Sequence, residues 1–466
     1  MSATPLPLHL PPLEGLPVLV YSLGIEGRDL ARWLLRHGAR VTISDTRTNE
    51  ELASAGAVPP PGVERVVTGQ PLLDPEGFGL VAVSQSILRY NPALARAREL
   101  GIPITSQMRL FLQLCPGRTI GITGSSGKST TTALVGAIAA EAGVEYVLGG
   151  NIGEPLLGRL DEIRPDTDVI LEISHTQLQY TDRSPHIAAV TNVTPNHLDQ
   201  FSWDEYVGLK RNHIAHQGRD DIAVLNEDNP VTRTFIAGAK GRVVRTSIER
   251  LPDADGAGVD DGEVVIRRNG RATPVLPVSG IRLRGRHNLA NVVMACAIAA
   301  EAGWPVSAMA RAVRRFAGVP HRLEVVGRAN GATWVNDSIA TSPERTVAGL
   351  RSFEEPVILL LGGRDKHLPL DVLQAEVGQR CRGVVCFGEA GALFYDAVAR
   401  LVPSAVRVPA LEDAVAAAAR LARPGDVVLL SPAGTSFDRY PNFEARGEHF
   451  RQLVRQLPGF TPEVSP

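Results

Sequence analysis

The sequence has few cysteines, few aromatic residues and almost no net charge. It contains 4 cysteines in 466 residues, and no His or Cys cluster with the spacing of a zinc site accompanies them. We therefore expect Cys115, Cys296, Cys381 and Cys386 to be reduced thiols. The formal net charge of −2 offers no electrostatic attraction to nucleic acid or to an anionic membrane surface.

Long apolar runs and a recognisable targeting segment are also missing. No apolar run approaches the roughly 20 residues that a membrane helix needs. The segment Met1–Pro17 is proline-rich and has no basic residue before its first apolar stretch, so we expect no signal peptide. The content of 44% hydrophobic and 21% charged residues is that of an ordinary soluble globular protein. We also expect a cytoplasmic monomer without nucleic-acid or membrane partners.

The order of predicted elements indicates the fold class. A chain of 466 residues is too long for one core, and its predicted strands and helices alternate nearly throughout, which is typical of parallel α/β proteins. We expect a Rossmann-like domain over 1–116, a central P-loop ATPase-like domain over 117–317, and a second Rossmann-like domain over 318–466. Within the central parallel sheet, Asn269-Gly270 predicts the turn of a small β-hairpin region.

A phosphate-binding loop is the most informative segment. Residues 123–129 read Thr-Gly-Ser-Ser-Gly-Lys-Ser and lie between a β-branched strand and an alanine-rich helix. The backbone N–H groups of such a loop cradle phosphates, Lys128 can neutralise them, and the Ser129 hydroxyl can hold Mg²⁺. The usual pattern has a glycine where Ile122 stands, and the shorter loop from Gly124 indicates a narrower class of ATP-using enzymes.

Single polar residues in the central segment carry weaker signals. Glu172 lies on a strand of buried type and is either a Mg²⁺ ligand or an edge-strand acid facing solvent. His197 follows a strand end, where α/β sites cluster. Lys210 lies on a predicted helix, and spacing alone favours a solvated helix face. Asn288 and Asn291 are three residues apart and share a helix face, where they either contact a purine or cap the helix.

The outer segments place further polar groups at strand ends. The turn at Gly24 and the acid Asp45 after the second strand give a dinucleotide-fold arrangement, but the glycine fingerprint is too incomplete for a dehydrogenase. In the last segment, Arg322 and Asp337 stand beside strands and could reach a triphosphate and its ribose. Lys366 follows another strand at the carboxyl edge, where open α/β sheets bind ligands.

Taken together and in order, these segments resemble the Mur ligase family, the ATP-dependent amino-acid-adding enzymes of peptidoglycan precursor synthesis. The resemblance spans nearly the whole chain, and its terminal signature favours the member that adds D-glutamate. It rests on Thr-Gly-x-x-Gly-Lys-Ser-Thr at 123–130, Gly-Asn-Ile-Gly at 150–153, Leu-Glu-Ile-Ser at 171–174, Asn-Val-Thr-x-x-His-Leu-Asp at 192–199, Pro-His-Arg-Leu-Glu at 320–324, Asn-Asp-Ser at 336–338, Leu-Leu-Ser-Pro-Ala at 429–433 and Asn-Phe-Glu-x-Arg-Gly at 442–447.

The resemblance implies a role for individual residues. The implied ATP-binding residues are Gly124, Ser125, Ser126, Gly127, Lys128, Ser129, Thr130, Asn288, Asn291, Arg322 and Asp337. The implied contacts to the UDP-linked substrate are Gly24, Asp45, Thr46, Arg47 and Asn151. The implied glutamate contacts are Thr341, Lys366, Ser436 and Phe443. The implied catalytic residues are Lys128, Glu172, His197 and Lys210, with Mg²⁺ held by Ser129, Glu172, His197 and a carbamylated Lys210.

The same resemblance implies the reaction. It is the ATP-dependent ligation of D-glutamate to UDP-N-acetylmuramoyl-L-alanine through an acyl phosphate, a cytoplasmic step that serves cell-wall synthesis, cell shape and division. An L-glutamate-adding relative and a folylpolyglutamate synthase-like ligase are alternatives, and a non-catalytic P-loop nucleotide-binding regulator is an alternative of another class. The separate N-terminal nucleotide-sugar segment argues against the folylpolyglutamate reading, and three successive ligand-edge clusters argue against the regulator.

Four positions depart from the family pattern. Ile339 stands where the family usually has a lysine beside the glutamate, and Asn196 stands where an acid usually precedes the histidine. Ser-His-Thr at 174–176 replaces Ser-Ser-Phe, and Ser-Gln-Ser at 84–86 replaces Ser-Pro-Gly near the UDP site. These departures bear on the identity and handedness of the amino acid more than on the type of reaction.

Overall fold

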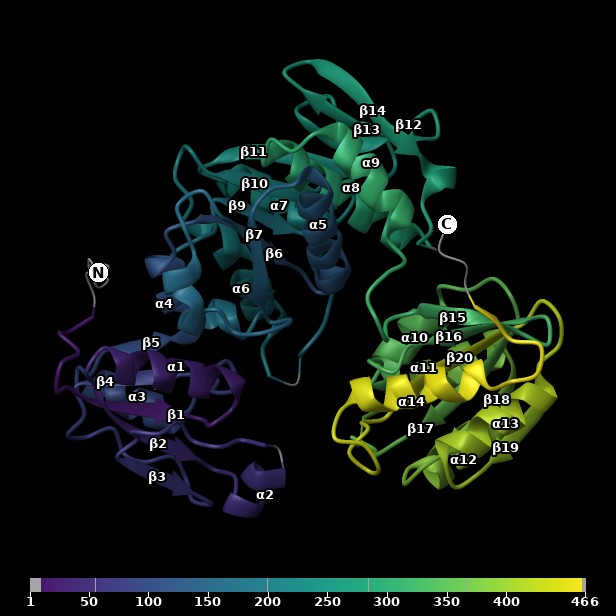
Figure 1. Ribbon diagram of the computed structural model, residues 1–466, viewed down its shortest axis with the longest axis horizontal. Helices are drawn as coiled ribbons and strands as arrows, with labels where there is room; N and C mark the ends of the chain where they lie inside the picture. Colours follow the sequence, from purple (N-terminus) through teal and green to yellow (C-terminus); the bar gives the residue numbers. More distant parts are fainter. Residues whose placement is uncertain (1–9, 55, 199, 284, 367, 463–466) are drawn as a thin grey trace. The chain divides into compact units, whose positions relative to one another are not determined.

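Three sheets organise the part of the chain that the structure describes (Figure 1). The structure is a computed structural model and describes residues 10–54, 56–198, 200–283, 285–366 and 368–462. Its contacts divide the chain into two compact units, which we call unit 1 (residues 1–281 and 286–314) and unit 2 (residues 282–285 and 315–466). Unit 1 contains a five-stranded and a nine-stranded sheet, and unit 2 contains a seven-stranded sheet.

The first sheet of unit 1 is fully parallel, with strand order β3-β2-β1-β4-β5. Its central strand β1 has the sequence PVLVY and is buried on both faces, as expected for a strand covered by helices. The strands are β1 (Pro17–Tyr21), β2 (Arg40–Asp45), β3 (Arg65–Thr68), β4 (Leu80–Val83) and β5 (Ile104–Ser106). The helices are α1 (Ile25–Arg36), α2 (Asn49–Ser54), α3 (Pro92–Glu99) and α4 (Gln107–Leu114).

Helix α1 begins directly after Gly24, the residue of the predicted turn. Gly24 is its N-cap, with an extended backbone at φ −66° and ψ −175°. The helix therefore includes Glu26 in its first turn, where the helix dipole favours an acid. Its apolar stripe, with Leu30, Trp33 and Leu34, packs into the core of this sheet.

The nine-stranded sheet has the order β14-β13-β12-β11-β10-β9-β6-β8-β7. Its strands run parallel from β7 to β12, and only the last pairs, β12 with β13 and β13 with β14, are antiparallel. The strands are β6 (Arg118–Thr123), β7 (Tyr146–Gly150), β8 (Asp168–Glu172), β9 (Ile187–Val190), β10 (Ile222–Asn226), β11 (Arg242–Ser247), β12 (Gly256–Asp260), β13 (Glu263–Arg268) and β14 (Arg271–Pro277).

Five helices accompany this sheet. They are α5 (Lys128–Ala142), α6 (Trp203–Ala215), α7 (Pro230–Phe235), α8 (Arg286–Glu301) and α9 (Val306–Arg315). The predicted hairpin is confirmed, with Asn269 and Gly270 forming its turn between β13 and β14 at φ values of 51° and 73°. The carboxyl ends of β6, β8 and β9 lie side by side, because β6 pairs with both neighbours in parallel.

The sheet of unit 2 has the order β19-β18-β17-β20-β16-β15-β21. Helices cover it on both sides, with α10, α11 and α12 over one face and α13 and α14 over the other (Figure 1). The strands are β15 (Glu324–Ala329), β16 (Ala332–Asn336), β17 (Val357–Gly362), β18 (Cys381–Phe387), β19 (Ser404–Arg407), β20 (Val427–Ala433) and β21 (Thr461–Pro462). The helices are α10 (Pro343–Leu350), α11 (Asp371–Arg380), α12 (Gly391–Val398), α13 (Leu411–Leu421) and α14 (Phe443–Arg455).

The architecture confirms the predicted parallel α/β class. The apolar runs of β17 and β20 are wholly buried, which is why both form inner strands of a two-sided parallel sheet. Among the described residues, we find no helix with both the length and the apolar character that crossing a membrane requires.

The cysteines are all unbridged and sheltered from solvent to differing degrees. Cys296, Cys381 and Cys386 are buried, and Cys115 is partly buried. Burial raises the pKa of the Cys296, Cys381 and Cys386 thiols to about 12 and that of Cys115 to about 11.

Candidate functional site

The predicted phosphate loop has the backbone shape that its glycines allow. Gly124 has φ +150°, and a Cβ there would lie 1.9 Å from the Thr191 hydroxyl. Gly127 has φ +82°, and its Cβ would lie 2.3 Å from Asn291 Oδ1. Both positions therefore require glycine on grounds of conformation and space. The loop leads from the end of β6 into the first turn of α5, so it lies at the N-terminus of that helix, a position that favours anions.

Lys128 and Ser129 begin helix α5 at this loop. The Lys128 ammonium donates hydrogen bonds to the carbonyls of Gly124 at 2.9 Å and Ser125 at 3.1 Å. Ser129 and Thr130 are buried in the first turn of the helix. The Lys128 ammonium thus contacts the same loop in which a phosphate would bind.

Two residues that brace the loop were absent from the predicted site. Asn192 accepts hydrogen bonds from the Ser126 N–H at 3.1 Å and hydroxyl at 3.2 Å, and its own amide donates to the Ser126 carbonyl at 3.1 Å. The Tyr206 hydroxyl lies 3.0 Å from the Ser125 hydroxyl. Asn192 comes just after β9, so its position at a strand end is the sequence signal that could have found it.

Glu172 lies at the carboxyl end of β8, beside the phosphate loop. It is 2% exposed, which excludes the reading of a solvent-facing edge acid. Its Oε1 accepts a hydrogen bond from the Asn151 amide at 2.7 Å, while its buried Oε2 has no hydrogen-bond partner. A buried carboxylate oxygen left without a donor is suited to a cation.

Lys210 is fully buried, so the reading that spacing alone favoured, a solvated helix face, is wrong. Its Nζ donates a hydrogen bond of 3.1 Å to the Thr123 hydroxyl at the end of β6. Three residues along α6, the His213 ring lies 3.0 Å from the Gly121 carbonyl, so this face of the helix is docked on β6. Burial, with a contribution from the charge of Lys128, holds the pKa of Lys210 well below its usual range.

His197 lies in the segment after β9 and has a left-handed backbone with φ 55°. The His175 ring stacks on it with a centroid separation of 4.0 Å, and Phe201 meets His175 edge-on. Burial, together with the charges of His197, Lys210 and Lys128, lowers the pKa of His175 to about 3, and its Nε2 is buried without a partner. Asp199, which ends the predicted motif, lies outside the described residues.

The asparagines of α8 meet the phosphate loop. Asn291 donates a hydrogen bond of 3.2 Å to the Asn288 side chain, which agrees with the predicted shared face. Asn291 Oδ1 also accepts a hydrogen bond of 3.4 Å from the Thr131 hydroxyl of α5. The two amides therefore lie beside the helix that begins at Lys128.

A second polar group forms at the carboxyl ends of β1 and β2. Asp45 is buried and accepts hydrogen bonds from the Leu23 N–H at 2.7 Å and from the Arg47 guanidinium at 2.7 and 3.0 Å. Although burial opposes it, these bonds hold the pKa of Asp45 below its usual range. Gly24 lies at the adjacent turn, and Thr46 is exposed beside Arg47. The structure thus brings four of the predicted UDP-site residues together, while Asn151 lies with Glu172.

In unit 2, Asp337 stands just after β16 and is buried. Its carboxylate accepts hydrogen bonds from the Ser431 hydroxyl at 2.8 Å and from the Leu323 N–H at 3.2 Å. Burial raises the pKa of Asp337 to about 7, against the opposing effect of the nearby Arg322 charge. The two predicted nucleotide contacts of this unit are therefore neighbours.

The predicted glutamate contacts lie at the carboxyl edge of the same sheet. Lys366 Nζ donates a hydrogen bond of 3.4 Å to the Thr341 hydroxyl. Ser436 is buried in the segment after β20, and Phe443 begins α14, where its carbonyl accepts a hydrogen bond of 2.8 Å from Ser338. Partial desolvation and the positive charge of Arg345 lower the pKa of Lys366.

Arg446 is a further residue that the predicted site did not include. It is fully buried and donates hydrogen bonds to the Ser338 hydroxyl at 3.0 Å, the Ser338 carbonyl at 2.9 Å and the Gly434 carbonyl at 3.1 Å. It therefore joins the segments after β16 and β20, which carry Thr341 and Ser436. Its place in the Asn-Phe-Glu-x-Arg-Gly motif was the available signal.

We expect Arg446→Met to destabilise the protein by about 2–5 kcal/mol, because three buried acceptors lose their donor. The measurement is the urea unfolding midpoint, with an unchanged slope of the transition. The matched control is Arg439→Met, which removes an exposed ion pair to Glu412 at 2.8 Å and should cost under about 1 kcal/mol. Equal losses in the two variants would contradict this account of Arg446.

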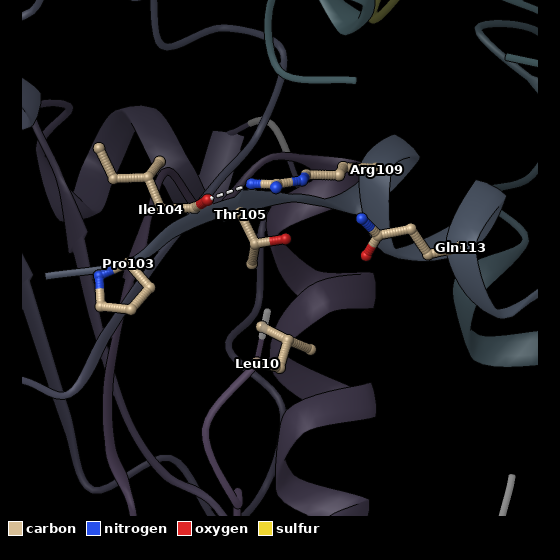
Figure 2. Close-up of a pocket in the computed structure, with 6 residues that line it drawn as sticks. All are labelled: Leu10, Pro103, Ile104, Thr105, Arg109 and Gln113. Carbon is tan, nitrogen blue, oxygen red and sulfur yellow. Dashed lines mark hydrogen bonds between the residues drawn. The ribbon is translucent and has the colours of Figure 1, made fainter. Parts of the chain in front are cut away.

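A cavity of about 280 Å³ lies away from these groups, near β5 and α4. Figure 2 shows its lining residues, with the Arg109 guanidinium donating a hydrogen bond of 2.8 Å to the Ile104 carbonyl. Arg109 also pairs with Asp182 at 2.5 Å, and Gln113 donates to the same carboxylate. The Arg109 guanidinium and the Gln113 amide are thus both bonded to other parts of the protein, and no lining residue is a predicted site residue.

Comparison with known families matches most of the chain. The model of the Mur ligase middle domain matches residues 122–299, and that of the Mur ligase, glutamate ligase domain, matches residues 321–434. The sequence is 41% identical over 449 residues to UDP-N-acetylmuramoylalanine--D-glutamate ligase of Symbiobacterium thermophilum, covering 94% of this chain and 97% of that protein. It is 37% identical to the protein of the same name from Clostridium novyi, covering 94% and 96%.

Solved structures share the fold at low sequence identity. UDP-N-acetylmuramate-alanine ligase from Thermotoga maritima matches with a TM-score of 0.57 and 17% identity over 94% of this chain and 98% of that one. MurF ligase from the same organism, in complex with ADP, matches with a TM-score of 0.56 and 19% identity over 94% and 95%.

Proposed function

This chain belongs to the Mur ligase family, and from that premise we propose that it ligates D-glutamate to UDP-N-acetylmuramoyl-L-alanine with ATP as the energy source. The product belongs to peptidoglycan precursor synthesis. ATP supplies the activation that a free carboxylate needs before an amine can displace an oxygen from it.

The observation that carries this proposal is the arrangement of groups at one edge of the nine-stranded sheet. The phosphate loop, which contains Lys128, follows β6, and the buried Glu172 ends β8. The buried Lys210 donates a hydrogen bond to the end of β6. A regulator that only binds nucleotide has no need of a buried unpartnered carboxylate oxygen and a buried amine beside its phosphate loop. Phosphoryl transfer uses such groups, because charge develops on the transferred group.

In the first step, the carboxylate of the UDP-linked substrate attacks the γ-phosphorus of ATP, and ADP leaves. The loop N–H groups and the Lys128 ammonium, released from the carbonyls of Gly124 and Ser125, neutralise the phosphoryl oxygens. The product of this step is an acyl phosphate, whose phosphate is a good leaving group. The glutamate amine then attacks the acyl carbon, loses a proton and displaces inorganic phosphate.

The residues present fit a magnesium ion. Among the described residues, no three His, Cys, Asp or Glu side chains are grouped closely enough to hold a metal by themselves. The open Oε2 of Glu172, the Ser129 hydroxyl and His197 would hold the ion together with phosphate oxygens. When bound, magnesium would neutralise phosphate charge. A carbamate on Lys210 would add a second anionic group, and the lowered pKa of this lysine favours the neutral amine that carbamate formation needs.

We further propose three functional domains with boundaries at residues 116 and 317. The first would bind the UDP moiety through Asp45, Thr46 and Arg47, and the last would bind glutamate. The Asp45–Arg47 pair supports the first assignment, because it fixes an acid and a cation at the carboxyl edge of a Rossmann-like sheet. The proposal uses residues of this chain alone, so we expect a monomer to be active. We expect it to act in the cytoplasm, where ATP is accessible.

The side chains near Lys366 support glutamate as the amino acid. Ile339 supplies no cation, but Arg345 donates a hydrogen bond of 3.1 Å to the Ile339 carbonyl, and its charge reaches Lys366. Two cations at this edge suit an amino acid with two carboxylates. Arg345 lies outside the family pattern, in which position 339 itself carries the cation.

We expect at least about 100-fold more ligation product with D-glutamate than with L-glutamate at equal concentration, because fixing two carboxylates and an amine leaves one handedness. The assay is ADP release and product mass with UDP-N-acetylmuramoyl-L-alanine, with reactions that omit either co-substrate as controls. A preference for L-glutamate would identify an L-glutamate-adding relative. ADP release that needs neither co-substrate would overturn the ligase assignment.

A further inference from the structure

The segment after β4 is joined to the segment after β8 by several hydrogen bonds. The Arg89 N–H donates to the Gln179 side chain at 2.9 Å, and the Tyr180 hydroxyl donates to the Ile87 carbonyl at 2.7 Å. The first segment follows β4, which pairs with β1 on the side opposite to β2, the strand that ends at Asp45, and the second follows Glu172. These hydrogen bonds therefore join the two sheets of unit 1.

Gln85 is at the centre of this connection. Its side-chain oxygen accepts hydrogen bonds from the Ser174 hydroxyl at 2.8 Å and from the Thr176 hydroxyl at 3.2 Å. These two hydroxyls are also 2.9 Å apart, so the three groups form a closed set. One acceptor thus fixes two positions of the segment that begins two residues after Glu172.

A buried carboxylate fixes the same segment from the other side. Glu26, in the first turn of α1, accepts hydrogen bonds from the Gln85 N–H at 2.7 Å and from the Gln177 amide at 2.6 Å. Gln177 in turn accepts a hydrogen bond of 2.9 Å from the Ser174 N–H. Glu26 and Gln177 are both buried, which strengthens hydrogen bonds between polar groups.

The segment held in this way reaches the phosphate-loop region. His175 lies between Ser174 and Thr176, and its ring stacks on His197 at 4.0 Å. Glu172 is two residues from Ser174 and accepts the Asn151 hydrogen bonds through its side chain and its carbonyl. A displacement of Gln85 would therefore be transmitted to the surroundings of both His197 and Glu172.

We propose that Gln85 is a positioning residue that couples binding of the uridine-nucleotide substrate to binding of ATP. Occupation of the site near Asp45 orders the segment after β4, and Gln85 transmits that order to residues 174–177. The inference rests on the proposed function, because it assigns the two ligands to the two sites. It implies a coupling free energy between the two sites, so that each ligand changes the affinity of the other by the same factor.

The test is calorimetric titration of the full chain with a magnesium-bound, non-hydrolysable ATP analogue. The dissociation constant is measured with and without saturating UDP-N-acetylmuramoyl-L-alanine. For the wild type, we expect the second ligand to tighten the first by about fivefold or more, with the same factor when the order is reversed. In Gln85→Leu this factor should fall to within twofold of one, while each ligand alone binds within about threefold of wild type.

Two further variants separate coupling from general damage. Gln85→Glu keeps an oxygen that accepts from both hydroxyls and should retain most of the factor. Ser86→Ala is the matched control, because the Ser86 hydroxyl bonds to Ser84 within its own segment at 2.7 Å, and its factor should equal that of the wild type. If Gln85→Leu does not fold, Thr176→Val removes one of the two donors and should lower the factor.

The outcomes are distinct. A wild-type factor of one, or a factor that survives in Gln85→Leu or in the folded Thr176→Val, would overturn the positioning role and leave the proposed ligase intact. A loss of the factor in Ser86→Ala equal to that in Gln85→Leu would also overturn it. Failure of the wild type to bind the UDP-linked substrate at all would overturn both proposals.

Discussion

Lys128→Ala is expected to lower kcat for ADP release by about 10³-fold while the fold is retained. Lys128 is the cation built into the phosphate loop, and its ammonium lies 2.9 and 3.1 Å from two loop carbonyls. In the transition state the transferred phosphoryl group spreads negative charge over its oxygens, so a cation placed there acts more strongly than it does on the ground state. The KM for ATP should change less than kcat.

Lys240→Ala is the matched control, because this lysine is exposed and precedes the amino end of β11, whereas the site residues of this sheet lie at carboxyl ends of strands. It should keep wild-type activity. Circular dichroism and thermal unfolding establish whether Lys128→Ala is folded. Near-normal ADP release from the folded variant would remove the phosphate loop from the proposed chemistry.

Lys210→Ala is expected to lose at least about 100-fold in kcat and to recover part of it with acetate. The Lys210 amine is buried against Thr123, and burial lowers its pKa, which favours the unprotonated, nucleophilic form of the amine. Attack of this amine on CO₂ forms an N–C bond and releases one proton, which converts a neutral group into an anion. Acetate in the space left by the side chain would restore that anion.

Two measurements separate this chemistry from a structural role of Lys210. Carbon-13 NMR of the wild type in labelled bicarbonate should show a carbamate signal that is absent from Lys210→Ala, and this readout needs no turnover. Acetate should not rescue Lys128→Ala, because that variant lacks a cation. Full activity of Lys210→Ala would refute the assignment, and a carbamate signal that persists without Lys210 would place the modification elsewhere.

Local patterns predicted the parts of the fold that depend on neighbouring residues. The phosphate loop was readable because its glycines, the strand before it and the helix after it are contiguous. The Asn269-Gly270 turn was readable because both residues need a left-handed backbone. The turn at Gly24 was also predicted, but not its role as the N-cap of α1, because glycine can serve either as a turn residue or as an N-cap.

Burial and partners across the sheet could not be read in the same way. Helix α6 carries polar residues around most of its circumference, so periodicity gave no sign that Lys210 faces β6. Asn192 and Gln85 act on residues 66 and 89 positions away, at Ser126 and Ser174. The first pair follows from the strand order of one sheet, and the second joins two different sheets, so both depend on the folded structure.

The site in unit 2 shows a further reason why some site residues could not be predicted from the sequence. Ile339 replaces the lysine of the family pattern, whereas the structure places the charge of Arg345 near Lys366. The positive charge missing at one position can be supplied by a residue elsewhere in the sequence when the fold brings that residue close. Arg446 is a similar case. Its three hydrogen-bond acceptors belong to Ser338 and Gly434, so its neighbours in sequence do not reveal its role.

The sheltered cysteines have a practical consequence for labelling. With thiol pKa values of about 11 and 12, the thiolate fraction at neutral pH is about 10⁻⁴ or less, against a few per cent for an ordinary exposed thiol. Maleimide dyes react with the thiolate, so the native chain gives little background. Cysteines introduced on the surface, one on each unit, would accept a donor and an acceptor dye without replacing the four native ones. Energy transfer between the dyes would then follow the separation of the units in each ligand state.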